Sequence, residues 1–384
     1  MRIAVIAPTA IPARRANTLQ VMKMSQAMAL LGHDVRMAAP GRPPELSPDA
    51  QPSPVWDGLE RLYGLQKPFP IHWLAGSPGL KRYDYGWKAV RWARSWRADL
   101  LYTRLPQAAV LASISGIPTV LEIHDMPQGR LGPLLFRIFL RGSGARRLAV
   151  ITRSLAADLA RRYRIPADPP FTVIAPDGVD LERYENFPSP QAARAALPIL
   201  YGKGFTAGYT GHLYAGRGVE LILELAAGLP EITFLLVGGE PPDVARVKAE
   251  AEAEGLLNVL LAGFIPNAEL PGYQAACDVM LMPYQRRVAA SSGGDIARYL
   301  SPMKLFEYLA CGRPILSSDL PVLREVLNQE NSILLPPDDP QAWTAALRSL
   351  CGDPARRAAL GEAARRDAVQ YTWEARAEKV LDGL

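Results

Sequence analysis

The residues best suited to chemistry lie in the stretch 301–319, which reads SPMKLFEYLACGRPILSSD. Ser301 as an N-cap and Pro302 at the first helical position are typical of a helix start. The free backbone N–H groups at such a helix start, together with the ammonium of Lys304, form a favourable binding site for phosphate. Glu307 follows within an otherwise apolar helix, so its carboxylate needs a partner. The hydroxyls of a ribose or sugar would supply one; an arginine or the backbone is the alternative.

A second segment, GHLYAGRG from Gly211, has the composition of a phosphate-binding turn. Gly211 and Gly216 allow the backbone to approach a ligand closely, and Arg217 can donate two hydrogen bonds to a phosphate. Glycine turns between a strand and a helix are common, so the segment alone is a weak indication. Combined with Lys304 and the helix start from Ser301 to Met303, it predicts a clamp for a diphosphate.

The third candidate is His124, which follows a predicted strand containing Glu122. Ligands bind at the carboxyl ends of the strands in open parallel sheets, so a side chain at this position faces a proposed cleft. There His124 could hydrogen-bond a sugar hydroxyl or accept a proton; a structural histidine is the alternative. Asp125 either orients the imidazole or caps the next turn.

Several other classes of site are disfavoured by what the sequence lacks. The first strand is followed by APTAIPARRANT, which has no glycine for a dinucleotide-binding fingerprint, so a nicotinamide oxidoreductase is disfavoured. The sequence contains no Walker P-loop, zinc-ligand spacing or Gly-x-Ser-x-Gly elbow. The cysteines Cys277, Cys311 and Cys351 are too scattered for a disulfide set and are expected to be small buried hydrophobic residues.

The charge is unevenly distributed over the 384 residues. Residues 1–198 hold 26 Lys and Arg against 15 Asp and Glu, a balance of +11, and the remainder has a balance of −6 because the whole chain is +5. An anionic membrane surface, a lipid-phosphate acceptor and nucleic acid are candidate partners, although no recognised nucleic-acid module is present. The segment WKAVRWARSWR, residues 87–97, predicts a basic amphipathic helix that either lies on a membrane or packs its Trp face on a sheet.

Strand and helix signals alternate, which predicts parallel sheets covered by helices. The first series of strands is expected at 2–8, 35–39, 99–103, 118–123, 147–152 and 171–174. The second is expected at 205–210, 232–237, 259–262, 279–282 and from Pro314, after a linker zone at 188–198. We expect a surface loop at 40–54 because that run is rich in proline. No stretch of ~18 apolar residues and no leader before the first strand are visible, so a cytoplasmic protein is expected.

Taken together, these strings resemble the family 4 retaining glycosyltransferases, which adopt the α/β GT-B fold of two Rossmann-like, doubly wound domains facing across a cleft. The resemblance is carried by GHLYAGRG, by SPMKLFEYLACGRPILSSDLPVLREVL and by YTWEARAEKVL. It implies an N-terminal acceptor-binding domain at 1–190 and a nucleotide-sugar-binding domain at 200–368. It also implies a final helix, 369–384, that packs back on the first domain.

The same resemblance assigns roles to individual residues. Glu307 matches the second carboxylate of the family's Glu-x7-Glu motif, which binds the donor ribose. Arg217 matches the group that grips the diphosphate, and His212 stands where a further arginine is usual. Ile265 falls where the backbone meets the base, and His124 matches the histidine that faces the transferred sugar.

One departure from the family pattern is plain. The first Glu of Glu-x7-Glu is replaced by Tyr299, so recognition of the donor hydroxyls must differ. Asp295, in the SSGGD loop, is a candidate for the missing carboxylate. His212 in place of an arginine weakens the expected clamp and leaves Lys304 to compensate.

The resemblance implies transfer from a nucleotide diphosphate sugar, UDP- or GDP-linked, with retention and by a front-face mechanism that needs no metal. The acceptor would be a glycan, a lipid-linked molecule or a small molecule, as in polysaccharide biosynthesis. Arg217 and Lys304 are suited to stabilising charge on the leaving phosphate. A GT-B-fold sugar-nucleotide epimerase is the alternative, but it would need acid–base residues that the sequence does not show. A two-lobed solute receptor is disfavoured because no export signal is visible.

Overall fold

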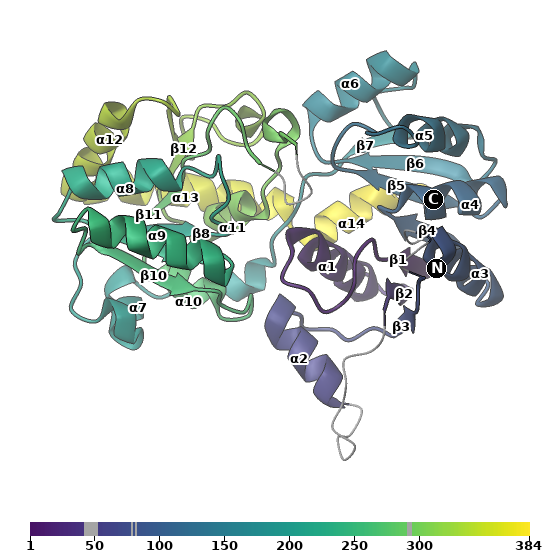
Figure 1. Ribbon diagram of the computed structural model, residues 1–384, viewed down its shortest axis with the longest axis horizontal. Helices are drawn as coiled ribbons and strands as arrows, with labels where there is room; N and C mark the ends of the chain where they lie inside the picture. The colour runs from purple at the N-terminus through teal and green to yellow at the C-terminus, as the bar shows by residue number, and fades with distance from the viewer. Residues whose placement is uncertain (42–52, 78–79, 81–82, 290–293) are drawn as a thin grey trace. The chain divides into compact units, whose positions relative to one another are not determined.

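The computed structural model describes residues 1–41, 53–77, 80, 83–289 and 294–384 (Figure 1). The chain forms two compact units: the first holds Met1–Asp177 together with Trp373–Leu384, and the second holds Gly178–Thr372. Each unit is a parallel sheet covered by helices, so both have the Rossmann-like architecture that the alternating pattern predicts. Most of the proline-rich run expected to form a surface loop, residues 42–52, lies outside the described residues.

The first unit contains a seven-stranded sheet in the order β3-β2-β1-β4-β5-β6-β7, with every neighbouring pair parallel. Its strands are β1 (Arg2–Ile6), β2 (Asp34–Pro40), β3 (Ile71–Leu74), β4 (Leu100–Thr103), β5 (Thr119–Ile123), β6 (Ala145–Val150) and β7 (Thr172–Ile174). The strand order reverses between β1 and β4, the point at which doubly wound sheets bind ligands beyond the strand ends.

The helices of the first unit come from both ends of the chain. They are α1 (Ala16–Leu30), α2 (Ser53–Tyr63), α3 (Tyr83–Ser95), α4 (Pro106–Ile114), α5 (Gly132–Arg141), α6 (Arg153–Tyr163) and α14 (Trp373–Leu381). α14 packs against α1, and its Val380 and Arg376 are buried in this unit. The last helix therefore completes the first unit, although it follows the whole of the second unit in sequence.

The basic helix α3 packs its Trp face on the sheet. Trp92 and Trp96 stack with centroids 6.0 Å apart and pack against the buried core, and the guanidinium of Arg36 lies 4.6 Å from the Trp96 ring centroid. Of the two interpretations of WKAVRWARSWR, the structure supports packing on the sheet for these two residues. Trp87, on the same helix, stays 51% exposed.

The second unit contains a six-stranded parallel sheet in the order β10-β9-β8-β11-β12-β13. Its strands are β8 (Thr206–Thr210), β9 (Thr233–Val237), β10 (Val259–Gly263), β11 (Val279–Met282), β12 (Ile315–Ser318) and β13 (Ile333–Leu335). Its helices are α7 (Pro190–Ala196), α8 (Val219–Gly228), α9 (Pro241–Ala253), α10 (Leu270–Ala275), α11 (Met303–Cys311), α12 (Pro340–Gly352) and α13 (Pro354–Ala368). Single 3-10 turns occur at Leu181–Tyr184, Pro198–Leu200, Ala297–Tyr299, Leu323–Glu325 and Val369–Tyr371.

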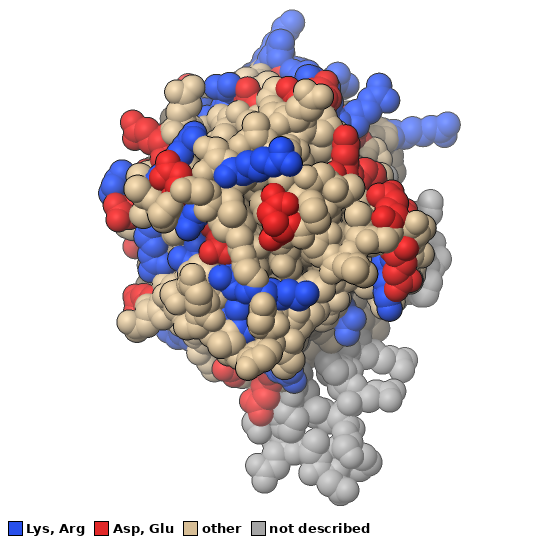
Figure 2. Space-filling view, turned by 90° about the vertical axis from the view of Figure 1, so that its left-hand side faces the viewer, with Lys and Arg blue, Asp and Glu red and all other residues tan. Residues whose placement is uncertain are grey.

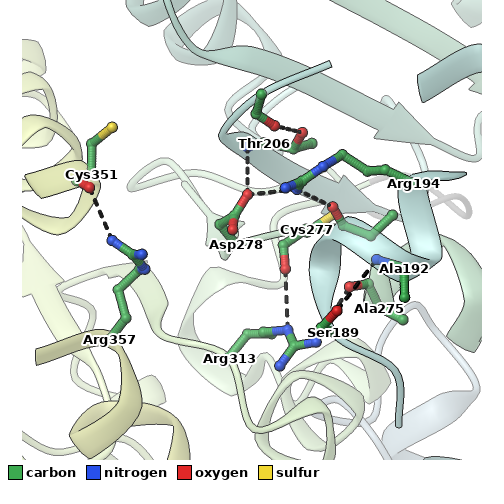
Figure 3. A network of polar contacts seen from close by, with 12 residues as sticks. Ser189, Ala192, Arg194, Thr206, Ala275, Cys277, Asp278, Arg313, Cys351 and Arg357 are labelled. Carbon is green, nitrogen blue, oxygen red and sulfur yellow. Dashed lines mark hydrogen bonds and ion pairs between the residues drawn. The ribbon is translucent and has the colours of Figure 1, made fainter. Parts of the chain in front are cut away.

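The zone expected to be a linker, 188–198, is an ordered part of the second unit and contains α7. Arg194 of α7 is buried and forms an ion pair with Asp278 at 2.7 Å between Nη1 and Oδ2 (Figure 3). The same carboxylate accepts a hydrogen bond from the backbone N–H of Thr206 at 2.8 Å, and Arg194 also donates to the carbonyl of Ala276. The linker prediction was wrong because proline and alanine here begin and fill a short capped helix.

One face of the second unit carries charges of both signs. Figure 2 looks onto the side of the second unit that carries α12 and α8, and there Lys and Arg are interspersed with Asp and Glu.

Cys277 and Cys311 are buried as expected, whereas Cys351 is exposed, so the prediction was wrong for this third cysteine. Among the described residues, no helix combines the length and the apolar character needed to cross a membrane.

Candidate functional site

In the first unit, the carboxyl end of β5 carries the predicted histidine. Glu122 and His124 are two residues apart on an extended segment, so their side chains lie on the same face. The Nε2 atom of His124 forms a short contact with Oε1 of Glu122. The side chain of Glu122 is fully buried, whereas that of His124 is 20% exposed and lines a pocket.

Two further residues hold the same carboxylate oxygen of Glu122. Gln20 of α1 donates a hydrogen bond from Nε2 to Oε1 at 2.7 Å, and Arg376 of α14 forms an ion pair with Oε1 at 3.0 Å. Burial acts to raise the pKa of Glu122, but Arg376 and His124 outweigh it and lower that pKa below its ordinary value. Glu122 is therefore an ionised carboxylate whose Oε1 contacts His124, Gln20 and Arg376, while its Oε2 has no hydrogen-bond partner among the described residues.

The imidazole of His124 is neutral at physiological pH. Burial and the positive charge of Arg104 lower the pKa of His124 to about 4, against the opposing effect of Glu122. Arg104 itself lines the pocket, and burial lowers the pKa of its guanidinium to about 10, which leaves it charged at neutral pH. The pocket therefore presents a neutral imidazole next to a cation.

Sequence reasoning missed Asp177, which lies beside this pair. Oxygen atoms of Asp177 and Glu122 and a ring nitrogen of His124 lie within 4.8 Å of one another. Burial raises the pKa of Asp177 to about 7, and its Oδ1 has no hydrogen-bond partner among the described residues. The guanidinium groups of Arg104 and Arg376 act electrostatically on this carboxyl and oppose a divalent cation, so we interpret the cluster as a hydrogen-bonding arrangement.

The pocket next to His124 has a volume of about 250 Å³ and is formed within the first unit. Its lining includes Arg104, Glu122, His124, Asp125, Gln128 and Phe136. Asp125 accepts a hydrogen bond from the backbone N–H of Met126 at 2.7 Å and bonds the side chain of Gln128. Of the two roles considered for Asp125, the structure supports capping of the following turn.

In the second unit, the candidate site lies at the start of α11. The helix begins at Met303 with Pro302 as its N-cap, so the prediction of Ser301 as N-cap was wrong by one residue. The φ and ψ of Pro302 are −81° and 129°, extended values that the proline ring permits. The helical residues therefore begin after it, at Met303. The backbone N–H of Leu305 bonds the carbonyl of Pro302 at 2.9 Å.

Lys304 is buried among aromatic rings. Its Nζ lies 3.6 Å from the ring centroid of Tyr209 and 5.4 Å from that of Tyr284. Nζ has no hydrogen-bond partner among the described residues. Burial and the nearby charge of Arg217 lower the pKa of Lys304 well below its ordinary value, and Glu307 opposes this shift. The surroundings of Lys304 therefore disfavour its charged form, and no described residue accepts a hydrogen bond from Nζ.

The glycine turn after β8 brings a second cation to the same place. Arg217 donates from Nη1 to the hydroxyl of Tyr284 at 3.2 Å, while its Nε is buried without a partner. Burial acts to lower the pKa of Arg217, but Tyr284 and Tyr209 outweigh it and raise that pKa. Lys304 lies over the same Tyr284 ring and is affected by the charge of Arg217, so the structure brings these two predicted cations together.

Close contacts with the protein's own backbone explain why two positions of this turn need glycine. Gly216 and Gly218 have φ of +80° and +81°, and a Cβ there would lie 2.1 Å from the carbonyl oxygen of Arg287 and 1.9 Å from that of Pro283. A Cβ on Gly211 would lie 3.0 Å from Nζ of Lys304. These glycines therefore let the turn pack on the segment after β11 and let Lys304 approach Gly211.

His212 lies in the same turn and stacks on Tyr214, with ring centroids 4.7 Å apart. Its Nδ1 is buried without a hydrogen-bond partner among the described residues. Burial, Arg217 and Lys304 lower the pKa of His212, so its imidazole is neutral and adds no charge to the two cations.

Glu307 lies one turn after Lys304 and has neutral partners. Gln274 donates to its Oε2 at 3.1 Å, and Asn267 lies 3.5 Å from its Oε1. The partners of Glu307 within the protein are thus side-chain amides, and not the arginine or backbone group that was the alternative to a sugar hydroxyl. Ile265 is half-buried and packs against the core that contains α11.

The loop that precedes α11 is only partly described. Oδ1 of Asp295 accepts hydrogen bonds from the backbone N–H groups of Val288 and Ala297, both at 2.9 Å, which lowers the pKa of this carboxyl. Residues 290–293 of the SSGGD region lie outside the described residues. Tyr299 is half-buried, and the guanidinium of Arg298 lies 5.8 Å from its ring centroid.

Comparison with known proteins assigns a family to both units. Residues 204–353 match the family model described as Glycosyl transferases group 1, and residues 19–183 match that of Glycosyltransferase Family 4. The D-inositol 3-phosphate glycosyltransferase of Xylanimonas cellulosilytica is 30% identical over 323 residues, which cover 81% of this chain and 69% of the relative. The phosphatidyl-myo-inositol mannosyltransferase of Mycolicibacterium smegmatis is 26% identical and covers 99% of this chain and 92% of its own length.

Solved structures give the same fold. Sucrose-phosphate synthase from Thermosynechococcus elongatus superposes with a TM-score of 0.72 at 20% identity, over 98% of this chain and 96% of that one. Anabaena HepE, solved with UDP, gives 0.71 at 17% identity, over 99% and 98% of the two chains. The two relatives named above are transferases, which does not favour the epimerase alternative. The chain therefore belongs to the family 4 glycosyltransferases with the GT-B fold and is itself a glycosyltransferase.

Proposed function

We propose that the second unit binds a nucleotide diphosphate sugar through Lys304 and Arg217. The observation that carries this proposal is the pair of buried cationic side chains with unpartnered nitrogen atoms, Nζ of Lys304 and Nε of Arg217. A buried, unsatisfied charged donor costs about 3 kcal/mol or more, and a diphosphate would supply the missing acceptors. The start of α11 adds backbone N–H groups and the positive end of a helix dipole.

The remaining donor contacts follow from the neighbours of these cations. Both carboxylate oxygens of Glu307 accept from neutral amide donors, so ribose hydroxyls can replace or join those bonds. The backbone at Ile265 is the proposed contact for the base. UDP and GDP are the proposed nucleotides, and the structurally similar HepE was solved with UDP and with UDP-glucose.

The proposed reaction is a retaining, front-face transfer that uses no metal. The bond between the sugar's anomeric carbon and the β-phosphate oxygen breaks, the acceptor oxygen forms its bond on the same face, and the acceptor's proton passes to the leaving phosphate. Lys304 and Arg217 stabilise the charge that develops on that phosphate. His124, a neutral imidazole, would hydrogen-bond the sugar and carry no proton of the reaction.

The donor proposal is tested by a thermal-shift screen against UDP, GDP, ADP and their sugar conjugates, with and without EDTA. One nucleotide should raise the melting temperature by several degrees at millimolar concentration, since a ligand at 100 times its Kd adds about 2.7 kcal/mol of stability. EDTA should not change the shift. No shift with any nucleotide, or a shift abolished by EDTA, would contradict the proposed clamp. NMR of the product's anomeric proton would test retention.

We further propose that the acceptor carries a phosphate. Arg104 places a guanidinium in the pocket beside His124, and residues 1–198 hold an excess of positive charge of +11. Two relatives are named for inositol 3-phosphate and phosphatidyl-myo-inositol acceptors. Transfer to myo-inositol phosphate should exceed transfer to myo-inositol, and Arg104→Gln should remove the preference. Equal transfer to both would contradict a phosphate site.

Association with an anionic membrane surface is a separate proposal. Leu131 and Leu134, at the start of α5, are each 51% exposed and lie near the exposed Arg137 and Arg141. This arrangement favours α5 over α3, whose Trp92 and Trp96 are engaged with the sheet. The protein should sediment with phosphatidylglycerol vesicles but not with phosphatidylcholine vesicles. The variant Leu131→Ser/Leu134→Ser should stay in the supernatant; no sedimentation of the parent protein would contradict the proposal.

A further inference from the structure

Arg376 connects the last helix of the chain to the pocket residue His124. It lies on α14, is 4% exposed, and forms an ion pair with Oε1 of Glu122 at 3.0 Å. Its Nε donates to the carbonyl of Pro176 at 2.9 Å, and its Nη1 lies 3.3 Å from the hydroxyl of Tyr102. A guanidinium held by so many contacts has one orientation, and that orientation fixes the carboxylate of Glu122.

The hydrogen-bonding state of His124 follows from that of Glu122. An ionised carboxylate accepts hydrogen bonds and cannot donate them. The ring nitrogen that contacts it, Nε2, must therefore carry the proton. In a neutral imidazole the other nitrogen, Nδ1, then keeps a lone pair. Because His124 lines the pocket, Nδ1 is the ring nitrogen left for a ligand.

We propose that Arg376 and Glu122 are positioning residues for glycosyl transfer, which hold His124 as the Nε2–H tautomer so that Nδ1 accepts a hydrogen bond from a hydroxyl of the sugar in the pocket. This inference rests on the proposed role of His124 at the sugar. It assigns a function in the reaction to α14, whose other contacts, with α1 and with Arg147 of β6, are structural.

The charged groups around the imidazole explain why Arg376 is needed. Glu122 favours a protonated imidazolium, which has no lone pair, whereas Arg376 and Arg104 disfavour it. The fourth group that faces the cluster is Asp177, whose carboxyl is partly protonated near neutral pH because burial raises its pKa to about 7. Without Arg376, the buried Glu122 would lose its permanent cation, and His124 would become the group that neutralises it.

The four histidines of the chain allow a direct test by NMR of protein labelled with 15N in its histidine rings. Ring nitrogen shifts distinguish the two tautomers and the imidazolium, and single histidine substitutions assign the signals. In the parent protein, His124 should be the Nε2–H tautomer, with a pKa of about 4. In Arg376→Met, that pKa should rise toward the ordinary 6.5, and Arg376→Lys should restore most of the difference.

Arg147→Met is the matched control. Arg147 is buried on β6 and donates to the carbonyl of Val380 at 2.7 Å, so it also fastens α14 to the sheet, but it does not contact Glu122 or His124. This variant should lower the melting temperature while leaving the pKa and tautomer of His124 unchanged. If Arg147→Met changes the His124 signals as much as Arg376→Met does, the effect is one of helix docking and the proposal is wrong.

Kinetics provide the second measurement, with the nucleotide sugar selected by the thermal screen. Arg376→Met should lower kcat about 10- to 100-fold, since small misplacement of a contacting group has effects of this size, and it should leave KM for the donor nearly unchanged. Arg376→Lys should recover part of the loss. An unaltered His124 signal in folded Arg376→Met would overturn the inference, as would a divalent ion bound stoichiometrically by the parent protein at this cluster. A changed His124 signal with unchanged kcat would instead show that His124 has no role in transfer, and the proposed function of the second unit would stand.

Discussion

The two candidate sites treat buried charge in opposite ways. In the first unit, the carboxylate of Glu122 has an ion pair to Arg376 and bonds to Gln20 and His124. In the second unit, Nζ of Lys304 lies against the rings of Tyr209 and Tyr284, and no described residue accepts a hydrogen bond from it. The first unit therefore contains the counter-charge for its buried carboxylate, whereas the second unit has no described hydrogen-bond acceptor for Lys304. Under the proposed function, the first unit presents a neutral imidazole to the sugar, and the second unit takes the acceptors for its cations from an anionic ligand.

A cation that is already paired should be the most costly to remove, and Arg194 is such a case outside both sites (Figure 3). Arg194→Met leaves the carboxylate of Asp278 buried without its cation, so the free energy of unfolding should fall by about 3–5 kcal/mol in urea titrations. Nucleotide affinity of the folded fraction should not change. The double variant Arg194→Met/Asp278→Leu should recover much of the loss, and failure to recover would show that packing of α7, not charge, dominates.

Asp177 has a buried carboxyl oxygen with no hydrogen-bond partner among the described residues, and its effect on stability depends on pH. Its pKa is about 7 in the fold and 3.8 in the unfolded chain, so the folded state binds more protons between these values. The stability that this provides is present below pH 3.8 and is lost as the pH rises to 7. Asp177→Asn should therefore leave stability unchanged at pH 4 and raise it at pH 8 by on the order of 2–4 kcal/mol. Equal effects at both pH values in thermal melts would contradict the protonation difference.

In Lys304→Met, nucleotide affinity and stability should change in opposite directions. Loss of the ammonium should weaken nucleotide diphosphate binding about 100-fold in isothermal calorimetry, the size expected for a charged hydrogen-bonded contact. The ligand-free protein should melt at a higher temperature, since an unpartnered buried charge is removed. Lys304→Arg is the control that keeps the charge. A variant that binds as tightly as the parent protein would place the diphosphate elsewhere.

The smallest effect is expected at Glu307, whose amide partners remain when the charge is removed. Glu307→Gln should weaken binding of a nucleoside diphosphate about 10-fold, because hydroxyl bonds to a neutral amide are weaker than those to a carboxylate. Stability should change little, since Gln274 and Asn267 can still bond a side-chain amide. A matched comparison with inorganic diphosphate, which has no ribose, should show no loss; an equal loss would contradict the ribose assignment.

The sequence predicted the sheets well because parallel strands buried on both faces appear as short apolar runs. The strands expected at 205–210 and 279–282 are β8 (Thr206–Thr210) and β11 (Val279–Met282) in the structure. It predicted the stop of α11 at Gly312, whose φ of +59° suits glycine. It did not predict α7, because a short helix held by a buried ion pair leaves almost no periodic signal. Strand β3 was also missed, since its four residues, IHWL, are only half-buried.

The site residues also divide into those that local sequence spacing indicates and those that only long-range contacts place in the site. Lys304, Arg217 and Glu307 could be proposed because local spacing places them near a helix start or a glycine turn. Arg376 and Asp177 could not, since their contacts with Glu122 join segments more than fifty residues apart in sequence. Only the composition of the tail, YTWEARAEKVL, offered a signal, and it indicated a helix without indicating what its arginine contacts.

The chain returns from the second unit to the first at Trp373, and this has a consequence for biosynthesis. Residues 373–384 leave the ribosome after the whole of the second unit, yet they belong to the first. Until then Glu122 lacks its guanidinium, and α1 lacks the helix that covers it. Domains generally fold as units and from the N-terminus during synthesis, so the first unit waits for roughly the time taken to translate the second, about 10–40 s at ordinary elongation rates. A chain that stops before Trp373 would therefore lack both the helix that packs on α1 and the cation that pairs with Glu122.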